Sequence, residues 1–139
     1  MNKKLGCILL IDDDRATNFL NKMILDQMGC CEKVVAVESG PEGLDFLKTK
    51  IDGKYPHPEL LFLDINMPGM NGWEFLEQYK SLDEEIRAQV VLMMLTTSLN
   101  PDDFNRAEDL PEVKGYLNKP LNEERMAEVL RGYFPDLLL

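Results

Sequence analysis

Two patterns of apolar and polar positions alternate from one end of the chain to the other. Short runs of consecutive apolar residues are typical of strands buried on both faces, and apolar residues recurring every three or four positions are typical of helices. The predicted strands are residues 5–11, 33–38, 60–64, 89–97 and 115–117. Five strand and helix pairs in strict alternation predict a doubly wound α/β domain, in which a parallel sheet carries helices on both faces.

Capping residues indicate where several helices begin. Ser39 and Asn71 each stand three positions before a Glu, which is the spacing of a capping box. Asn100 precedes a proline at the first helical position, where a missing N–H costs nothing. The last helix is predicted over about 122–134. The first helix is predicted from apolar residues that recur at helical spacing, namely Ala16, Phe19, Leu20, Met23, Ile24 and Met28.

The length of 139 residues suits one domain, in which a single core buries about two thirds of the unfolded surface. We expect the core to span about residues 5–134 and the apolar tail, 135–139, to pack on it. No apolar run has the length of a membrane span, and the first residues do not form a signal peptide. These features predict a cytoplasmic protein with no membrane partner.

Charge and cysteine content exclude further classes. A net charge of −10 argues against nucleic-acid binding, because affinity for phosphate backbones needs clustered Lys and Arg. Of the three cysteines, Cys30 and Cys31 are adjacent and have no second pair to complete a metal site. We therefore interpret all three as reduced thiols that are buried or half-buried.

Charged and polar residues follow the predicted strands, at the sheet edge where open parallel sheets bind ligands. Asp12 and Asp13 follow the first strand, Asp64 ends the third, Thr96 lies at the end of the fourth, and Lys119 follows the fifth. Three carboxylates in one crevice repel each other, so a proton or a cation must hold them together. All-oxygen ligands favour Mg²⁺, with Mn²⁺ as a substitute. A salt bridge from Lys119 alone would leave two of the three charges unanswered.

The order of these residues resembles that of response regulator receiver domains of two-component signalling. The matching motifs are the Asp pair after the first strand, NMPGMNG after Asp64, a hydroxyl ending the fourth strand, and GYLNKP before the last helix. The resemblance covers about residues 5–134. It implies a flavodoxin-like (βα)5 fold with the sheet order 2-1-3-4-5. It also implies a phosphoacceptor domain, not an enzyme that turns over an external substrate.

The resemblance assigns a role to each matching residue. Asp64 would accept the phosphoryl group as an aspartyl phosphate, and Thr96 and Lys119 would contact the phosphoryl oxygens. The Mg²⁺ ligands would be Asp12, Asp13, Asp64 and the backbone carbonyl of Asn66.

The resemblance also implies a conformational switch formed by Thr96 and Tyr116. The alternative for Tyr116 is a strand aromatic residue that simply packs on the sheet. A cis peptide bond is expected between Lys119 and Pro120.

Three further residues are expected to tune the reaction. Asn66 and Ser98 stand two positions after Asp64 and Thr96, where side chains of the family set the dephosphorylation rate. Thr97 occupies a position where many receivers have a small Ala or Gly, and its size is expected either to narrow access for the phosphodonor or to hinder the movement of Tyr116.

The implied phosphoryl donor is a sensor histidine kinase or a histidine phosphotransfer protein. A downstream protein would bind the face formed by residues 101–134, and a homodimer through this face is a further possibility. The acidic character of the face predicts a basic partner, although a merely solvated surface is the alternative. Because 139 residues leave no room for an output domain, we expect a stand-alone receiver.

Two other functions are compatible with parts of the pattern. A receiver fold used as an unphosphorylated interaction module usually lacks one of the site residues, all of which are present here. A hydrolase resembling haloacid dehalogenases would use Asp12 of the D-x-D motif. It would also need a hydroxyl four positions later, where Ala16 stands, and an acidic pair closing a strand after Lys119, which the sequence lacks.

Overall fold

The computed structural model describes residues 4–87 and 89–137. Its elements, in chain order, are β1 (Leu5–Ile11), α1 (Arg15–Met28), β2 (Cys31–Val37), α2 (Gly40–Lys48), β3 (Leu60–Leu63), α3 (Gly72–Lys80), α4 (Glu84–Arg87), β4 (Val91–Thr96), α5 (Pro101–Glu108), β5 (Val113–Asn118) and α6 (Glu123–Tyr133).

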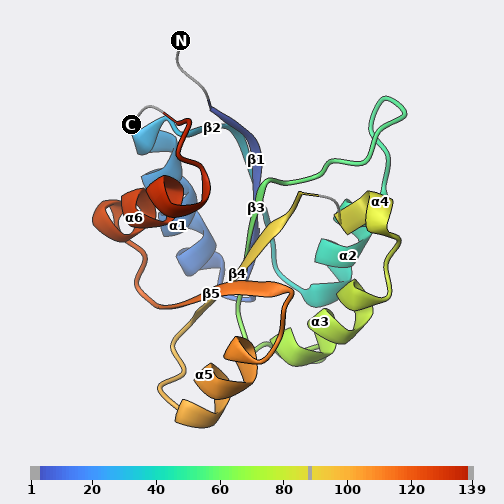
Figure 1. The fold of residues 1–139 in the computed structure, drawn as a ribbon, viewed down its shortest axis with the longest axis vertical. Coiled ribbons are helices and arrows are strands. Elements are labelled where there is room, and N and C mark those ends of the chain that lie inside the picture. Colours follow the sequence, from blue (N-terminus) through green and yellow to red (C-terminus); the bar gives the residue numbers. More distant parts are fainter. Residues whose placement is uncertain (1–3, 88, 138–139) are drawn as a thin grey trace.

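The five strands form one parallel sheet in the order β2-β1-β3-β4-β5, which confirms the predicted topology (Figure 1). β3 lies at the centre, and its four side chains are all buried. The order places the ends of β1 and β3 next to each other, with β4 and β5 following on one side. The residues that follow these strands are therefore neighbours in space.

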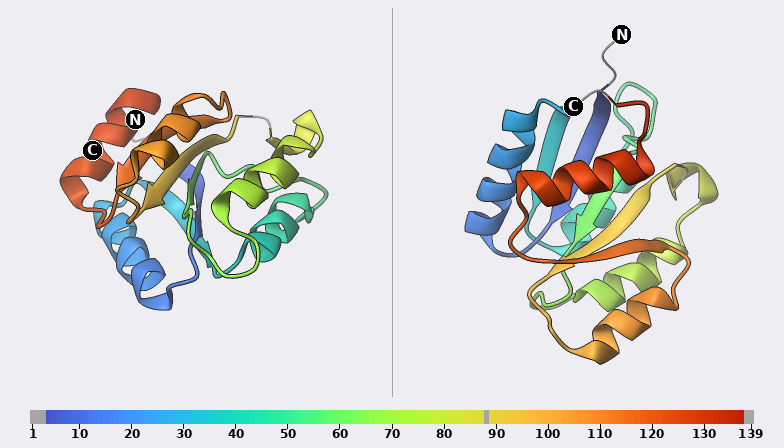
Figure 2. Two further views of the ribbon diagram at one scale, coloured as in Figure 1. Left: turned by 90° about the horizontal axis from the view of Figure 1, so that it is seen from below. Right: turned by 60° about the vertical axis from the view of Figure 1, so that its left-hand side comes forward.

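Helices cover both faces of the sheet (Figure 2). α1 and α6 pack on one face, where Leu25, Met126 and Leu130 contact the sheet residues Ile8, Leu10 and Phe62 in one core cluster. α2, α3 and α5 cover the other face. The inner strands β1, β3 and β4 are thus almost fully buried, as their apolar sequences predict, whereas the edge strands β2 and β5 keep exposed residues.

Several predicted element boundaries were wrong by a few residues. β2 begins two residues before the predicted start at 33, β5 extends beyond 115–117 at both ends, and β4 is shorter than 89–97. The helix α4, Glu84–Arg87, was not predicted. Its four residues make about one turn, which is too short for a helical period to show in the sequence.

The apolar residues that predict α1 are mostly not the ones that this helix buries, although Met28 packs against the core. Phe19 is 67% exposed, Leu20 51% and Met23 41%, whereas Asn18, Asn21 and Leu25 are the buried residues of the helix. α1 has an apolar stripe, but a different and partly polar stripe meets the sheet. The reason is that Asn18 donates hydrogen bonds to backbone carbonyls at the ends of the strands.

The N-terminal caps agree with the prediction. Asn71 and Glu74 form a complete capping box at α3, and the side chains of Ser39, Asn100 and Asn122 accept backbone N–H bonds at α2, α5 and α6. Each cap satisfies a backbone group that the helix itself cannot pair.

At the C-terminal end, Met126 and Leu130 of α6 are buried, whereas Tyr133 is 41% exposed. Leu137 packs against the core cluster that contains both buried residues. The remainder of the predicted tail, residues 138–139, lies outside the described part. Among the described residues, no helix combines the length and apolar character needed to cross a membrane.

Candidate functional site

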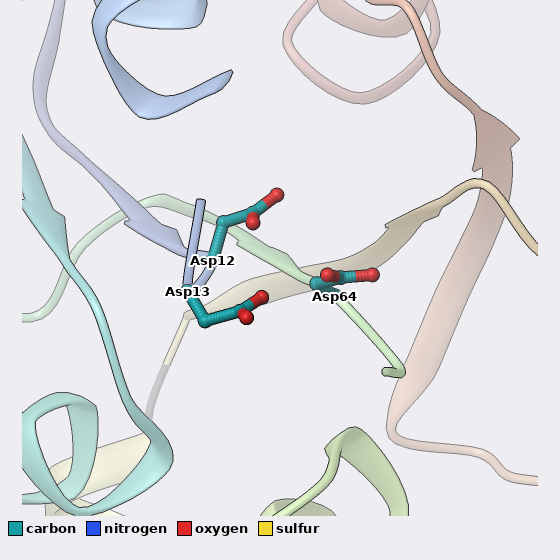
Figure 3. A group of neighbouring side chains, drawn as sticks. All are labelled: Asp12, Asp13 and Asp64. Atoms are coloured by element: carbon teal, nitrogen blue, oxygen red, sulfur yellow. The ribbon is translucent and has the colours of Figure 1, made fainter. Parts of the chain in front are cut away.

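Three carboxylates converge where β1 and β3 end (Figure 3). Asp12 and Asp13 directly follow β1, and Asp64 directly follows β3. One ligand oxygen from each side chain lies within 4.8 Å of the other two. Asp12 and Asp64 are only 5% and 6% exposed, whereas Asp13 is exposed. The cluster thus consists of two buried carboxylates, Asp12 and Asp64, and is accessible to solvent at Asp13.

Lys119 lies against the two buried carboxylates. Its Nζ atom is 2.5 Å from Asp12 Oδ2 and 3.3 Å from Asp64 Oδ2. One ammonium cannot balance three carboxylates, so the ionised cluster keeps an excess of two negative charges (three minus one). This excess of negative charge is consistent with the prediction, made from the sequence, that a cation binds the three carboxylates.

Burial and charge shift the pKa values of this group. Burial raises the pKa of the Asp64 carboxyl above its ordinary value; Asp12 adds to the increase and Lys119 opposes it. Burial alone would lower the pKa of Lys119, but the hydrogen bond to Asp12 and the charges of Asp12 and Asp64 raise it overall. Lys119 is therefore a permanent cation in the site.

The loop that carries Asp12 and Asp13 is held by a residue that the sequence analysis missed. The Nδ2 atom of Asn18 donates to the carbonyl oxygen of Asp12 at 2.9 Å and to that of Val37 at 3.2 Å. Asn18 thereby ties the end of β1 to the end of β2. The signal in the sequence was the spacing of Asn18 and Asn21, which places two amides on one stripe of α1.

The loop that follows Asp64 is compact. Ile65 and Met67 are buried, while Asn66 between them is exposed. The amide of Gly72 donates to the carbonyl oxygen of Ile65 at 2.8 Å and closes the loop onto α3. Asn66 thus lies two positions after Asp64 and is accessible to solvent. Its role as a metal ligand through its backbone carbonyl stays a prediction.

Side-chain hydrogen bonds hold the loop that follows β4. Thr96 is fully buried, and its Oγ1 accepts a hydrogen bond from the Ser98 amide at 3.1 Å. The Ser98 hydroxyl donates to Asp103 Oδ2 at 2.6 Å, which links the loop to the first turn of α5. Thr97 is exposed.

Tyr116 belongs to the same network. Its hydroxyl donates to the carbonyl oxygen of Ser98 at 3.3 Å, and its ring packs edge to face on Phe104, with 5.4 Å between ring centroids. The structure therefore brings together Thr96, Ser98 and Tyr116, as the switch hypothesis requires. The peptide bond between Lys119 and Pro120 is cis.

The three cysteines and Glu38 lie outside this site. All three cysteines are free; Cys7 and Cys30 are buried and Cys31 is half-buried. Glu38, which follows β2, pairs with Arg15 at 3.0 Å and does not join the acidic cluster.

Comparisons with known proteins agree with this geometry. Residues 8–131 match the family model of the response regulator receiver domain. The probable methanogenesis regulatory protein FilR2 of Methanothrix harundinacea is 32% identical over 130 residues, which cover 91% of this chain and 82% of FilR2. A two component response regulator from Cytophaga hutchinsonii is 31% identical, with a TM-score of 0.84 over 96% of this chain and all of that one.

The phosphorylated cyanobacterial phytochrome response regulator RcpA is 28% identical, with a TM-score of 0.71 over 92% of this chain and 90% of RcpA. The matched family is one of signalling domains in two-component systems, and its fold and acidic cluster are those found here. The chain therefore belongs to the response regulator receiver domain family.

Proposed function

We propose that this chain accepts a phosphoryl group on Asp64 from a sensor histidine kinase or a histidine phosphotransfer protein. In this proposal it acts as a single receiver domain, residues 1–139, in a cytoplasmic two-component or phosphorelay pathway and turns over no external substrate. The observation that carries the proposal is the convergence of three carboxylates and Lys119 at the ends of adjacent strands. The relative RcpA, whose solved structure is that of a phosphorylated response regulator, supports it.

Hydrogen bonding favours Asp64 over Asp12 as the nucleophile. In Asp12, Oδ1 accepts from the Asp14 amide at 2.9 Å and Oδ2 accepts from Lys119. Both oxygens of Asp12 are thus engaged at short distance, whereas Asp64 has a longer contact of 3.3 Å to Lys119 and an interaction with the Ile65 amide. This difference argues against a dehalogenase-like hydrolase that would use Asp12.

The donor set suits Mg²⁺, because all its ligand atoms are carboxylate oxygens. Asp13 is exposed, so water molecules could complete the coordination of the ion. Asp12, Asp13, Asp64 and the carbonyl of Asn66 would hold the ion, with Mn²⁺ as a substitute. A bound ion would neutralise charge on the phosphoryl group during its transfer. Lys119 would contribute a fixed positive charge beside Asp64, and Thr96 a hydroxyl donor.

The Ser98 bond to Asp103 gives the loop a direct connection to α5. Phosphorylation adds roughly −1.5 to −2 charges at the site, and Thr96 and Tyr116 would respond to them. The face that would change is formed by α5, β5 and α6, and we propose that it binds a basic downstream protein or a second copy of the chain. Its acidic residues are Asp102, Asp103, Glu108, Asp109, Glu112, Glu123 and Glu124.

The exposed apolar surface of α1 is the proposed docking site for the protein that donates the phosphoryl group. A groove of about 220 Å³ is lined by Leu20, Met23, Lys119 and Pro120, among other residues. Lys119 therefore borders both this groove and the carboxylates. A protein bound against Leu20 and Met23 would bring its phosphohistidine close to Asp64.

The proposal is tested by incubating the protein with acetyl phosphate and Mg²⁺. We expect one phosphoryl group per chain, located on Asp64 by mass spectrometry of peptides, and no product without a divalent cation. Modification of another carboxylate would contradict the assignment. Repeated turnover of a phosphoester through Asp12 would instead support the hydrolase.

A second prediction concerns the α1 surface. Phe19→Ser should slow phosphotransfer from a cognate histidine kinase by roughly tenfold, because one exposed aromatic anchor contributes about 1–2 kcal/mol at an interface. Phosphorylation by acetyl phosphate should not change. Ile51→Ser is the matched control, since Ile51 is 50% exposed in the loop between α2 and β3. Equal effects of both variants on kinase phosphotransfer would contradict this docking site.

A further inference from the structure

Asn118, the last residue of β5, holds both ends of the segment Thr96–Ser98. Its Nδ2 atom lies 2.9 Å from the carbonyl oxygen of Ser98 and, in a weaker contact, 3.5 Å from that of Thr96. Both partners are carbonyls, which can only accept hydrogen bonds. The amide nitrogen of Asn118, and not its oxygen, must therefore face them.

Other bonds from β5 and the residue after it reinforce this attachment. The Lys119 amide donates to the carbonyl oxygen of Thr96 at 2.9 Å, and the Tyr116 hydroxyl donates to that of Ser98 at 3.3 Å. Tyr116 and Asn118 are two positions apart, so their side chains leave the strand on the same side and share one acceptor. The segment is thus fastened to the strand that leads into Lys119.

This attachment also orients the Thr96 hydroxyl. The Ser98 amide donates to Thr96 Oγ1 at 3.1 Å and occupies one of its acceptor positions. A hydroxyl has a single proton and two acceptor sites, so the proton of Thr96 remains available for another acceptor. A Ser98 backbone that moved away from β5 would change the direction in which this proton points.

We propose that Asn118 is a positioning residue: it fastens the β4–α5 loop to β5, so that Thr96 and Lys119 are held ready for the same phosphoryl group. The inference rests on the proposed function, because it assigns Thr96 and Lys119 to the phosphoryl oxygens. Without the Asn118 bonds the loop samples other conformations, and the fraction of molecules competent to bind falls. The apparent affinity then falls by the same factor.

The test measures two affinities in variants of the full chain. Beryllofluoride serves as the phosphoryl mimic, titrated in the presence of Mg²⁺, and Mg²⁺ is titrated alone. Asn118→Leu keeps a similar volume but has no donor, and it should weaken beryllofluoride binding about 3- to 10-fold, the loss expected for one hydrogen bond. Mg²⁺ affinity should change less than about twofold, because the acidic cluster lies after β1 and β3, outside the β4–α5 loop.

Two further variants separate positioning from general damage. Asn105→Leu makes the same chemical change at an exposed site on α5 and should alter neither affinity. Tyr116→Phe removes the longer bond to the same carbonyl, so it should weaken beryllofluoride binding less than Asn118→Leu. The free-energy change of the double variant should differ from the sum of the two single changes, because the two donors share one acceptor.

The outcomes distinguish this inference from the proposed function. If the unaltered protein binds beryllofluoride and Asn118→Leu binds it equally well, the positioning role is wrong. An equal loss of Mg²⁺ affinity in Asn118→Leu would also overturn it, since general disruption of the site would then explain the result. If the unaltered protein does not bind beryllofluoride at all, the proposed function itself is wrong.

Discussion

Replacing Asp64 with Asn is expected to abolish phosphorylation and, at the same time, to stabilise the metal-free protein. The amide cannot form an acyl phosphate, so labelling by acetyl phosphate should disappear. The side chain is 6% exposed and lies beside the carboxylates of Asp12 and Asp13. Neutralising it removes repulsion and the cost of burying a charge. The gain in free energy of unfolding should be on the order of 1 kcal/mol, as is common when a destabilised functional residue is replaced.

The pH dependence follows from the raised pKa of Asp64. Burial raises this pKa above its ordinary value of 3.8, so the folded protein holds the proton more tightly than the unfolded chain does. The stability that this preference contributes is fully present below pH 3.8 and is lost as the pH rises through the raised pKa. The advantage of Asp64→Asn should therefore be absent in acid and present near neutral pH.

Urea unfolding of the unaltered protein and of Asp64→Asn, below pH 3.8 and near neutral pH with a chelator present, measures the difference in their free energies of unfolding. Asp45→Asn, at an exposed position of α2, is the control and should change stability little. A less stable Asp64→Asn protein would show that the attraction between Asp64 and Lys119 exceeds the cost of burial. Unchanged partner binding and signalling in this variant would favour the unphosphorylated interaction module.

Gly72→Ala is expected to cause a large loss of stability, about 2–3 kcal/mol, and to weaken phosphorylation of Asp64. A Cβ atom at Gly72 would lie 2.5 Å from the carbonyl oxygen of Asp64 and 2.9 Å from Cα of Ile65. Both atoms belong to the backbone, so the loop that carries the phosphoacceptor must move to make room. Chemical denaturation and the rate of labelling by acetyl phosphate measure the two effects.

Gly132→Ala is the matched control for this substitution. Gly132 lies within α6, and a Cβ atom there meets no atom within 4 Å beyond its chain neighbours and the backbone of its own helix. Alanine is favoured over glycine inside a helix by about 1 kcal/mol, so this variant should be slightly more stable than the unaltered protein. A stable Gly72→Ala protein with normal labelling would show that the loop after Asp64 is adaptable, contrary to the prediction.

The two predictions concern one structural compromise. Asp64 is buried with like charges beside it, and its loop is closed by a glycine that tolerates no side chain. Both features restrict where the carboxylate can lie. The stability that this arrangement costs is expected to be recovered when a cation binds the cluster.

The order of strands and helices could be predicted because the signals for it, apolar runs and helix caps, lie within short stretches of the sequence. Continuous apolar runs identified the buried strands, and the caps at Ser39, Asn71 and Asn100 identified three helix starts. The position of Asp64 at the end of its strand indicated the cluster, since parallel strands that are neighbours bring their carboxyl ends together. The four-residue α4 was missed because one turn contains no period to detect.

The sequence by itself determined the alternation of strands and helices and the residues that follow each strand. Only the tertiary structure decided which stripe of α1 meets the sheet, because Asn18 faces inward to pair with the carbonyls of Asp12 and Val37 and thereby leaves Phe19 exposed. It likewise brought Asn118 to the carbonyl of Ser98, twenty residues away. Periodicity reports how apolar a face is, whereas these bonds join backbone groups that become neighbours only when the strands assemble.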